Sequence, residues 1–355
     1  MKKAITAIIA LVLIALAAFG YMRAAQHRHG PSEVNPKEII YEHLGDAYGW
    51  EIPFAHDVRI PLPIIVKGQD GWHCFSSSRV TGGDTYEGFR INHGEEYNGK
   101  VVQVLDDGTV SRPLDLSITK NVAAIFVCAL LVTLMVFSVR NWYRKHGMKA
   151  PRRGTAVLEL IVDYVYTDTI RPILGKHSPK YAPYLLTVFF FILTMNLMGL
   201  VVVFPGGANL TGNLAVTMVL AVITFFVINL SGTREYWKEI LWPDVPLGLK
   251  CPVPMMPFIE ILGMFTKPVA LMVRLFANMM GGHKVVLVLM LLIFIFTGMF
   301  GAVVGGATTV FSLAFALFML ALDTLVSFIQ AYVFTILSTI FISMALVEPH
   351  GHEAK

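Results

Sequence analysis

Four polar side chains interrupt an otherwise apolar stretch within the last hundred residues. Glu260, Lys267 and Arg274 recur at seven-residue intervals, and Asn278 follows Arg274 by four residues. Because residues seven and four apart share a face of an α-helix, we expect all four side chains on one face. A guanidinium keeps its proton inside a protein, so Arg274 would place a permanent positive charge there. Such a charge favours the ionised form of a nearby carboxyl group, which is chemistry suited to proton transfer.

A second polar group lies further along the same apolar region. Asp323 and Gln330 are again seven residues apart. If the region folds into a hairpin about residue 303, His283 and Asp323 lie opposite one another, and Arg274 lies opposite position 332, next to Gln330. An imidazole that faces a carboxylate can accept and release protons near neutral pH. The pattern therefore predicts a proton-transfer site, because ionisable residues inside a membrane are functional by default.

Structural roles are the alternative for each of these residues. His283 follows a Gly-Gly pair and precedes Lys284, which also suits the end of a helix. The long side chain of Lys267 can extend to the membrane surface. The neighbouring Tyr332 and Phe276 are expected to serve packing.

The composition indicates that membrane helices carry these residues. The 355-residue chain is 55% hydrophobic and 15% charged, with a mean hydropathy of +0.63. Soluble domains carry about 25% charged residues, so the sequence predicts a polytopic membrane protein. The net charge of +4 requires no nucleic-acid partner. The three cysteines have no paired spacing, so neither a disulfide framework nor a metal site is predicted, and no cofactor is expected.

The N-terminal part of the chain predicts an exported region. Two lysines precede an apolar stretch that ends at Met22, so residues 1–22 fit a signal peptide or an N-terminal anchor. Residues 23–117 are mostly polar, and VVQVLDDGTVSRPL predicts a strand, an Asp-Gly turn and a second strand. We therefore expect a small exported domain over residues 23–117 and a membrane domain over residues 118–355.

The membrane domain begins with a span at residues 122–139, which are long and apolar enough to cross a bilayer. The segment after it, RNWYRKHGMKAPRR, carries six Lys and Arg residues, and no acid occurs until Glu159. By the positive-inside rule this flank is cytoplasmic. Apolar residues at helical spacing over 156–174 then predict an amphipathic helix on the cytoplasmic surface.

Two further spans are predicted at residues 181–203 and 214–230. FPGGANLTGN joins them as a turn, and it is no phosphate-binding loop because it lacks the Gly-Lys-Ser/Thr ending. Residues 231–254 are rich in proline and charge and predict a cytoplasmic loop.

The last hundred residues predict a long helical hairpin. No charge occurs in the 38 residues from Val285 to Leu322, and 24 further uncharged residues follow Asp323. GMFGAVVGG, residues 298–306, is the natural turn, which leaves two helices of about forty residues, each roughly 60 Å long. That is about twice the ~30 Å hydrocarbon thickness. A tilted hairpin keeps the backbone hydrogen-bonded, whereas breaking each helix into two spans leaves backbone groups unpaired in lipid.

The expected fold is thus all-α, with about five transmembrane helices that end in a long tilted hairpin, plus the small exported N-terminal region. Three segments of this fold resemble subunit a of the F-type ATP synthase, the membrane stator that faces the rotating ring of c subunits. FIEILGMFTKPVALMVRLFANMMGG, residues 258–282, is similar to the signature of that family in the order and spacing of Lys-Pro-Val, Arg-Leu-Phe and Asn-Met. LTMNLMGL (193–200) and LSTIFISMA (337–345) are also similar, and the resemblance covers roughly residues 115–348.

The resemblance implies a proton-translocating stator without a catalytic site of its own. Its expected partners are the c-subunit ring, the peripheral-stalk b subunits, the rest of the ATP synthase and the lipid bilayer. It implies a bacterial cell inner membrane location, with the C-terminus in the cytoplasm. The coupling ion stays open between H⁺ and Na⁺, because the ring carries the ion ligands.

Carried over by position, Arg274 would be the family's essential arginine, beside a polar path lined by Asn278 and Gln330. His283 stands where the family often has an acid and Asp323 where it often has a histidine, an exchange that keeps one imidazole and one carboxylate. The proton-translocation residues expected from the resemblance are Glu260, Arg274, Asn278, His283, Asp323 and Gln330.

Two other classes of function remain open at this stage. One is a secondary transporter with an intramembrane site of Arg274, Asp323 and His283, although no internal repeat of the kind frequent in that class is found. The other is a membrane scaffold or receptor whose binding module is the exported region. That class leaves the polar residues of the last two helices unexplained.

Overall fold

The computed structural model describes residues 45–51, 59–80, 84–92, 97–105, 109–147, 149, 151, 154–201, 208–241 and 255–346. The predicted signal peptide or anchor, residues 1–22, lies outside the described residues. The chain divides into two compact units. Unit 1 comprises Met1–Phe126, Val201–Ala208 and Lys284–Leu320, and unit 2 comprises Val127–Leu200, Asn209–His283 and Ala321–Lys355.

Unit 1 contains three small antiparallel sheets. The first pairs β1 (Gly49–Glu51) with β2 (Arg59–Pro61), the second has the order β4 (Gly71–Ser76), β3 (Pro63–Gly68), β8 (Leu114–Asp115), and the third has the order β5 (Phe89–Ile91), β6 (Val101–Val104), β7 (Val110–Ser111). Apolar side chains of β3, β4, β5 and β6 form the core of this region, around the fully buried Ile64, Val66 and Phe89.

The strand, turn and strand predicted for VVQVLDDGTVSRPL are confirmed as far as the described residues allow. Val104 of β6 pairs with Val110 of β7 in antiparallel register. The Asp-Gly turn itself, residues 106–108, lies outside the described residues. The sequence predicted this hairpin because Asp-Gly between two runs of β-branched residues is a strong short-range signal for a β-hairpin.

Among the described residues, five helical stretches are long and apolar enough to cross a membrane, which agrees with the predicted number. They are Lys120–His146, Gly154–Leu200, Leu214–Ser231, Met256–Ile293 and Thr308–Ala345. The first is helix α3 (Lys120–His146), and the third is α7 (Leu214–Ser231), whose N-terminus is capped by the Asn213 side chain. The chain is therefore a multi-pass membrane protein.

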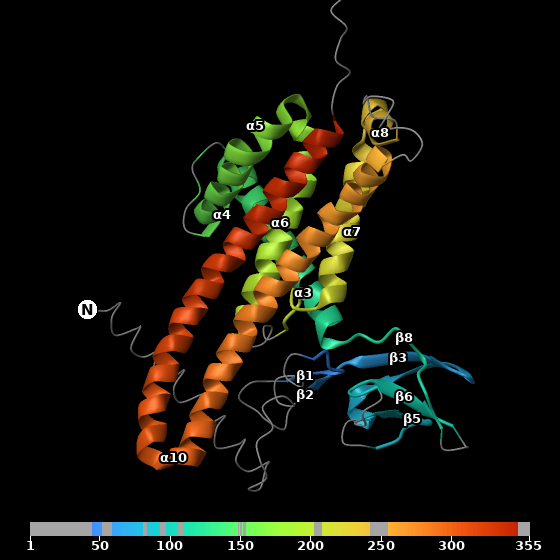
Figure 1. Ribbon diagram of the computed structural model, residues 1–355, viewed down its shortest axis with the longest axis vertical. Coiled ribbons are helices and arrows are strands. Elements are labelled where there is room, and N and C mark those ends of the chain that lie inside the picture. Colours follow the sequence, from blue (N-terminus) through green and yellow to red (C-terminus); the bar gives the residue numbers. More distant parts are fainter. Residues whose placement is uncertain are drawn as a thin grey trace, which may run out of the picture. The chain divides into compact units, whose positions relative to one another are not determined.

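The stretch Gly154–Leu200 is a series of helical segments. It consists of α4 (Gly154–Asp163), a π-helical segment (Tyr164–Ile170), α5 (Arg171–Leu174), a 3₁₀ turn (Gly175–His177) and α6 (Ser178–Leu200). The predicted helix at 156–174 is thus helical over its whole length. Gly175 adopts φ of 51°, which separates α5 from α6, and the chain changes direction there (Figure 1).

The predicted loop at residues 231–254 is wrong in its first part, because Arg234–Leu241 forms helix α8. The Thr233 hydroxyl accepts a hydrogen bond from the backbone N–H of Tyr236, as an N-cap does. The Thr233 N–H in turn donates to the carbonyl of Ala345, which fixes the start of α8 beside the end of the chain's last helix. The remainder, residues 242–254, lies outside the described residues.

The last helix, α10 (Met255–Ala345), comprises 91 residues and folds back on itself (Figure 1). Its first arm is Met256–Ile293 and its second arm is Thr308–Ala345, each of 38 residues. An arm of that length is about 57 Å long. This confirms the predicted pair of long helices. The predicted turn, residues 298–306, lies between the arms, and its side chains are outside the described residues.

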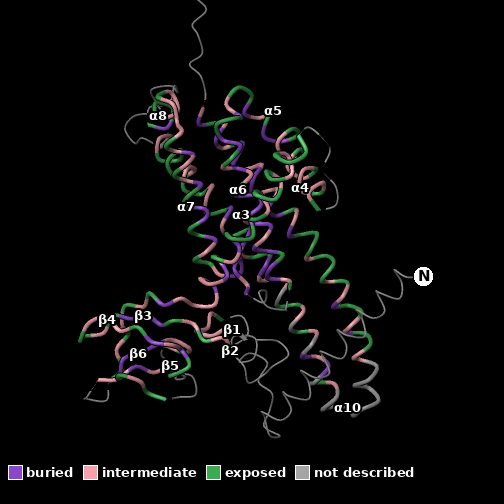
Figure 2. The backbone as a smooth tube through the Cα atoms, turned by 180° about the vertical axis from the view of Figure 1, so that it is seen from behind, coloured by how far each residue is buried: buried purple, intermediate pink, exposed green. Residues whose placement is uncertain are grey.

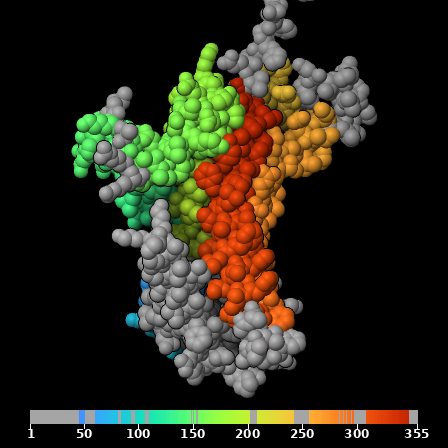
Figure 3. All heavy atoms as spheres, turned by 90° about the vertical axis from the view of Figure 1, so that its left-hand side faces the viewer, coloured from blue at the N-terminus to red at the C-terminus, as the bar shows by residue number. Residues whose placement is uncertain are grey.

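Helix α6 is the most deeply buried helix of unit 2. Its buried residues appear in purple along most of its length in Figure 2, and Leu185, Phe189 and Ile192 are fully buried. The second arm packs on α6 through an edge-to-face contact between Phe328 and Phe189, whose ring centroids lie 5.8 Å apart. The upper part of the second arm, red in Figure 3, forms part of the molecular surface beside the orange first arm.

Candidate functional site

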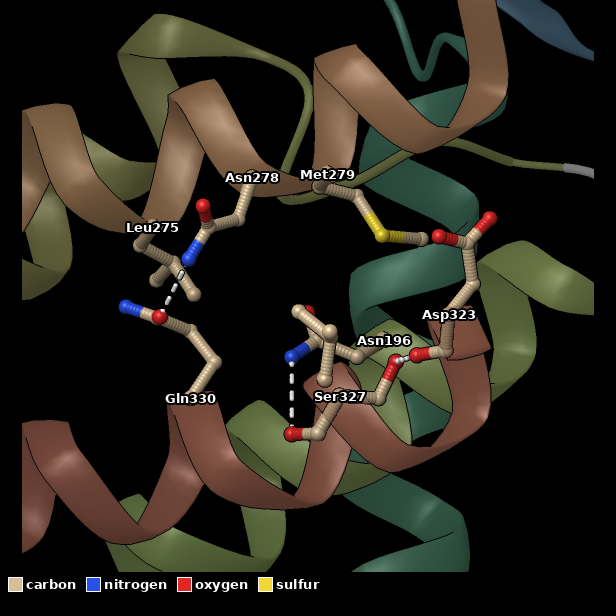
Figure 4. Close-up of a pocket in the computed structure, with 8 residues that line it drawn as sticks. Asn196, Leu275, Asn278, Met279, Asp323, Ser327 and Gln330 are labelled. Atoms are coloured by element: carbon tan, nitrogen blue, oxygen red, sulfur yellow. Dashed lines mark hydrogen bonds between the residues drawn. The ribbon is translucent and has the colours of Figure 1, made fainter. Parts of the chain in front are cut away.

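A hydrogen bond between two amide side chains joins the arms of α10. The Asn278 Nδ2 on the first arm donates to the Gln330 Oε1 on the second arm at 2.6 Å (Figure 4). Gln330 is only 4% exposed, whereas Asn278 is exposed. Two residues that were predicted to line one polar path beside Arg274 are therefore in direct contact.

A second contact between the arms brings Asp323 to the first arm. A Cβ atom built on Gly282 would lie only 2.5 Å from the Asp323 Oδ1, so the carboxylate sits directly over this glycine. Both pairings, 278 with 330 and 282 with 323, are centred within about one residue of position 303. The predicted register of the hairpin is therefore confirmed. The side chain of His283 lies outside the described residues, so its contact with Asp323 stays a prediction.

The guanidinium of Arg274 has no protein partner in the part of the chain that the structure describes. Arg274 is exposed, and among the described residues it has neither a hydrogen bond nor an ion pair. It lies one helical turn before Asn278 on the same face. The residue at the opposite position, Tyr332, accepts a hydrogen bond from the Thr169 hydroxyl at 3.1 Å, and its ring stacks on Tyr164. Tyr332 therefore packs against the π-helical segment, as expected from the sequence.

Three further polar residues, which the sequence analysis did not select, extend the site. Asn196 of α6 is 2% exposed, accepts a hydrogen bond from the Thr211 hydroxyl at 2.8 Å and donates to the Ser327 carbonyl at 3.3 Å. The Ser327 hydroxyl donates to the Asp323 carbonyl at 2.7 Å. An asparagine inside the apolar LTMNLMGL segment was a usable signal, since polar residues in spans are rare. No sequence pattern pointed to Thr211.

Most of these groups line one small, partly open pocket (Figure 4). Its cavity volume is about 10 Å³, enough for about one water molecule, and it is lined by Asn196, Leu275, Asn278, Met279, Asp323, Val326, Ser327 and Gln330. Amide, hydroxyl and carboxylate groups around such a space can hold water and pass protons through it. Among the described residues, no group of three or more His, Cys, Asp or Glu residues could hold a metal ion.

Glu260 and Lys267 are not part of this pocket. Glu260 is exposed, on the same face as Arg274. Burial raises the pKa of Tyr236 in α8, and the charge of Glu260 raises it further, so this carboxylate lies near α8. The Lys267 Nζ lies 5.4 Å from the centre of the Phe341 ring on the second arm, which is a cation–π contact between the arms.

Known proteins are similar to this chain over the part that contains this site. The family profile described as ATP synthase A chain matches residues 122–343, and a profile described as a domain of unknown function matches residues 39–116. ATP synthase subunit a of Chloroherpeton thalassium is 41% identical over 247 residues, which cover 68% of this chain and 70% of that protein. ATP synthase subunit a of Myxococcus xanthus is 41% identical over 269 residues, covering 74% and 80%. The chain therefore belongs to the ATP synthase A chain family.

Proposed function

We propose that this chain is the stator subunit of a rotary F-type ATP synthase, which provides two proton half-channels to and from the c ring. Proton flow through these half-channels is coupled to rotation of the ring and to ATP synthesis. The observation that carries the proposal is the exposed Arg274, which has no protein partner among the described residues and lies one helical turn from the Asn278–Gln330 hydrogen bond. The family match, which includes all of these residues, supports it.

The physical reason lies in the cost of charge in lipid. A carboxyl group on the ring must be neutral while it faces lipid, because an ionised group there is costly. A fixed cation favours the ionised form only in its own vicinity. Arg274, without a protein anion of its own among the described residues, is free to act on an arriving carboxyl group. It makes that group release its proton toward one half-channel and repels protons that would pass straight between the two.

The other polar residues supply the proton path. Asp323, His283, Asn278 and Gln330 carry protons between the outer aqueous phase and the ring. Asn196 now joins this group, because it lines the same pocket as Asp323 and Gln330. Glu260, which lies near α8, serves the cytoplasmic half-channel.

The remaining features of the chain follow from this role. We propose a bacterial inner-membrane location, peripheral-stalk b subunits as stator partners, and a cytoplasmic C-terminus. Residues 1–22 act as a signal peptide or anchor, residues 23–117 form an exported domain, and residues 118–355 form the membrane domain. A cytoplasmic C-terminus agrees with the basic flank that follows the first span.

The test is voltage-driven proton flux into vesicles, with the purified chain alone and with the chain assembled with its c ring. We expect flux only with the ring. Arg274→Ala should lower coupled ATP synthesis at least about a hundredfold, because a fixed charge at the reacting group is lost. Lys267→Gln, which removes the neighbouring cation of the same helix face, should keep ATP synthesis within about twofold. Steady flux from the chain alone, or near-normal synthesis with Arg274→Ala, would contradict the proposal.

A further inference from the structure

Gly282 has an unusual neighbour for a glycine inside a helix. The three atoms closest to a Cβ built on it all belong to Asp323, namely Oδ1 at 2.5 Å, Oδ2 at 2.6 Å and Cγ at 2.7 Å. Real Cβ atoms essentially never approach other atoms closer than 3.0 Å. The carboxylate therefore occupies the space that any side chain at position 282 would fill. The adjacent Gly281 has no such neighbour, since nothing lies within 4 Å of its built Cβ.

The helix itself gives no reason for glycine at this position. Gly282 lies in the interior of the first arm, where glycine is less favourable than alanine. Small residues often let two membrane helices approach closely, but then the space is filled by apolar side chain or backbone of the partner helix. Here the nearest atoms are the charged end of one side chain.

Met279 of the first arm also lies next to the Asp323 side chain. It precedes Gly282 by three residues and so lies on the same face of the first arm. Its side chain is 8% exposed and points toward the Asp323 carboxylate (Figure 4). On the second arm, the Ser327 hydroxyl donates to the Asp323 carbonyl.

From these contacts we infer that Gly282 is a positioning residue for Asp323. Gly282 and Met279 form a niche on the first arm that holds the carboxylate at the pocket, next to position 283. The inference rests on the proposed function in one respect, the role of Asp323 in proton transfer. A methyl group at position 282 would displace the carboxylate from the pocket, while the same change at position 281 would displace nothing.

The functional test measures proton flux through the assembled complex in vesicles. We expect Gly282→Ala to lower flux at least about tenfold and the matched control Gly281→Ala to stay within about twofold of wild type. In an Asp323→Ala background, Gly282→Ala should cause no further loss, because the residue acts through the missing carboxylate. Equal losses with and without Asp323, or unchanged flux in Gly282→Ala, would overturn the inference and would point to helix packing or to no role.

A second test needs no proton flux and remains informative if Gly282→Ala fails to assemble. Mild oxidation of the double variant Gly282→Cys with Asp323→Cys should give an intramolecular disulfide, because the two side chains meet. Gly281→Cys with Asp323→Cys is the control and should give at least about tenfold less. The absence of the 282–323 disulfide would overturn the niche itself. If that disulfide forms while Asp323→Ala retains full flux, the niche exists and the proposed role of Asp323 in transport is wrong.

Discussion

The two arms of α10 have the same length and similar hydrophobicity, but they differ in how far their polar side chains are exposed. On the first arm, Glu260, Arg274 and Asn278 are exposed. On the second arm, Gln330 is 4% exposed and Thr335 and Ser338 are fully buried. The first arm therefore presents charge and hydrogen-bonding groups outward, whereas the second arm keeps its Ser, Thr and Gln side chains between residues 327 and 339 inside the protein.

The buried hydroxyls of the second arm are satisfied by their own helix. Thr335, Ser338 and Thr339 each donate to the carbonyl four residues earlier, at 2.9, 2.7 and 2.7 Å. The second arm is thus packed against α6 and the π-helical segment. The polar side chains that are accessible to a partner protein lie on the first arm. This division agrees with the proposed role of the chain as a stator beside a moving ring.

The largest effect should come from the exposed cation of the first arm. Arg274→Lys keeps a positive charge but replaces the planar guanidinium by an ammonium group on a flexible alkyl chain. A desolvated lysine can also release its proton, which arginine does not. We expect ATP synthesis by the complex to fall at least about a hundredfold. Lys267→Arg, the reverse exchange on the same helix face, is the control and should leave ATP synthesis nearly unchanged. Full activity with Arg274→Lys would show that charge alone is sufficient.

The next effect should come from the residue that joins the second arm to α6. Asn196→Ala removes the acceptor of the Thr211 hydroxyl and the donor to the Ser327 carbonyl, both in buried surroundings. We expect a loss of about 1–3 kcal/mol in the free energy of unfolding, measured in detergent micelles. The neighbouring Leu197 is exposed, so Leu197→Ala should cost less than about 0.5 kcal/mol. Equal costs for the two variants would show that the buried network contributes little.

A smaller effect should follow from breaking the contact between the arms. Gln330→Leu removes the acceptor of the Asn278 amide, so Asn278 loses its fixed orientation beside Arg274. We expect about a tenfold loss of proton flux with the c ring present and little change in stability, because Asn278 is exposed. Ser338→Ala on the same arm is the control and should leave flux unchanged. A Gln330→Leu variant with normal flux would remove this contact from the proton path.

The smallest effect should come from the hydroxyls of the second arm. Thr335→Val keeps the shape of the side chain and removes a bond to a carbonyl that already belongs to the helix ladder. We expect less than about 1 kcal/mol of destabilisation and unchanged flux. A large loss of flux in Thr335→Val would show that the second arm also carries protons C-terminal to Gln330. The two arms would then not differ in their role in proton transfer.

Much of the architecture was readable from local sequence. The apolar lengths predicted the spans, the Asp-Gly turn predicted the pairing of β6 with β7, and the uncharged stretches around residue 303 predicted two long helices. The register of the hairpin followed from the spacing of a few polar residues. The helix α8 was missed because its N-cap involves Thr233, whose N–H is anchored by the distant Ala345 carbonyl.

The sequence by itself determined which residues are polar inside the membrane and at which helical intervals they recur, because both depend on the order of residues along one helix. Tertiary structure alone decided which of them meet. It paired Gln330 with Asn278 and left Arg274 without a partner among the described residues. It also joined Asn196 to both Thr211 and Ser327, and placed Asp323 over Gly282. These contacts depend on the rotation of each helix about its axis and on the distance between helices. Both are set by the packing of apolar side chains from the whole unit.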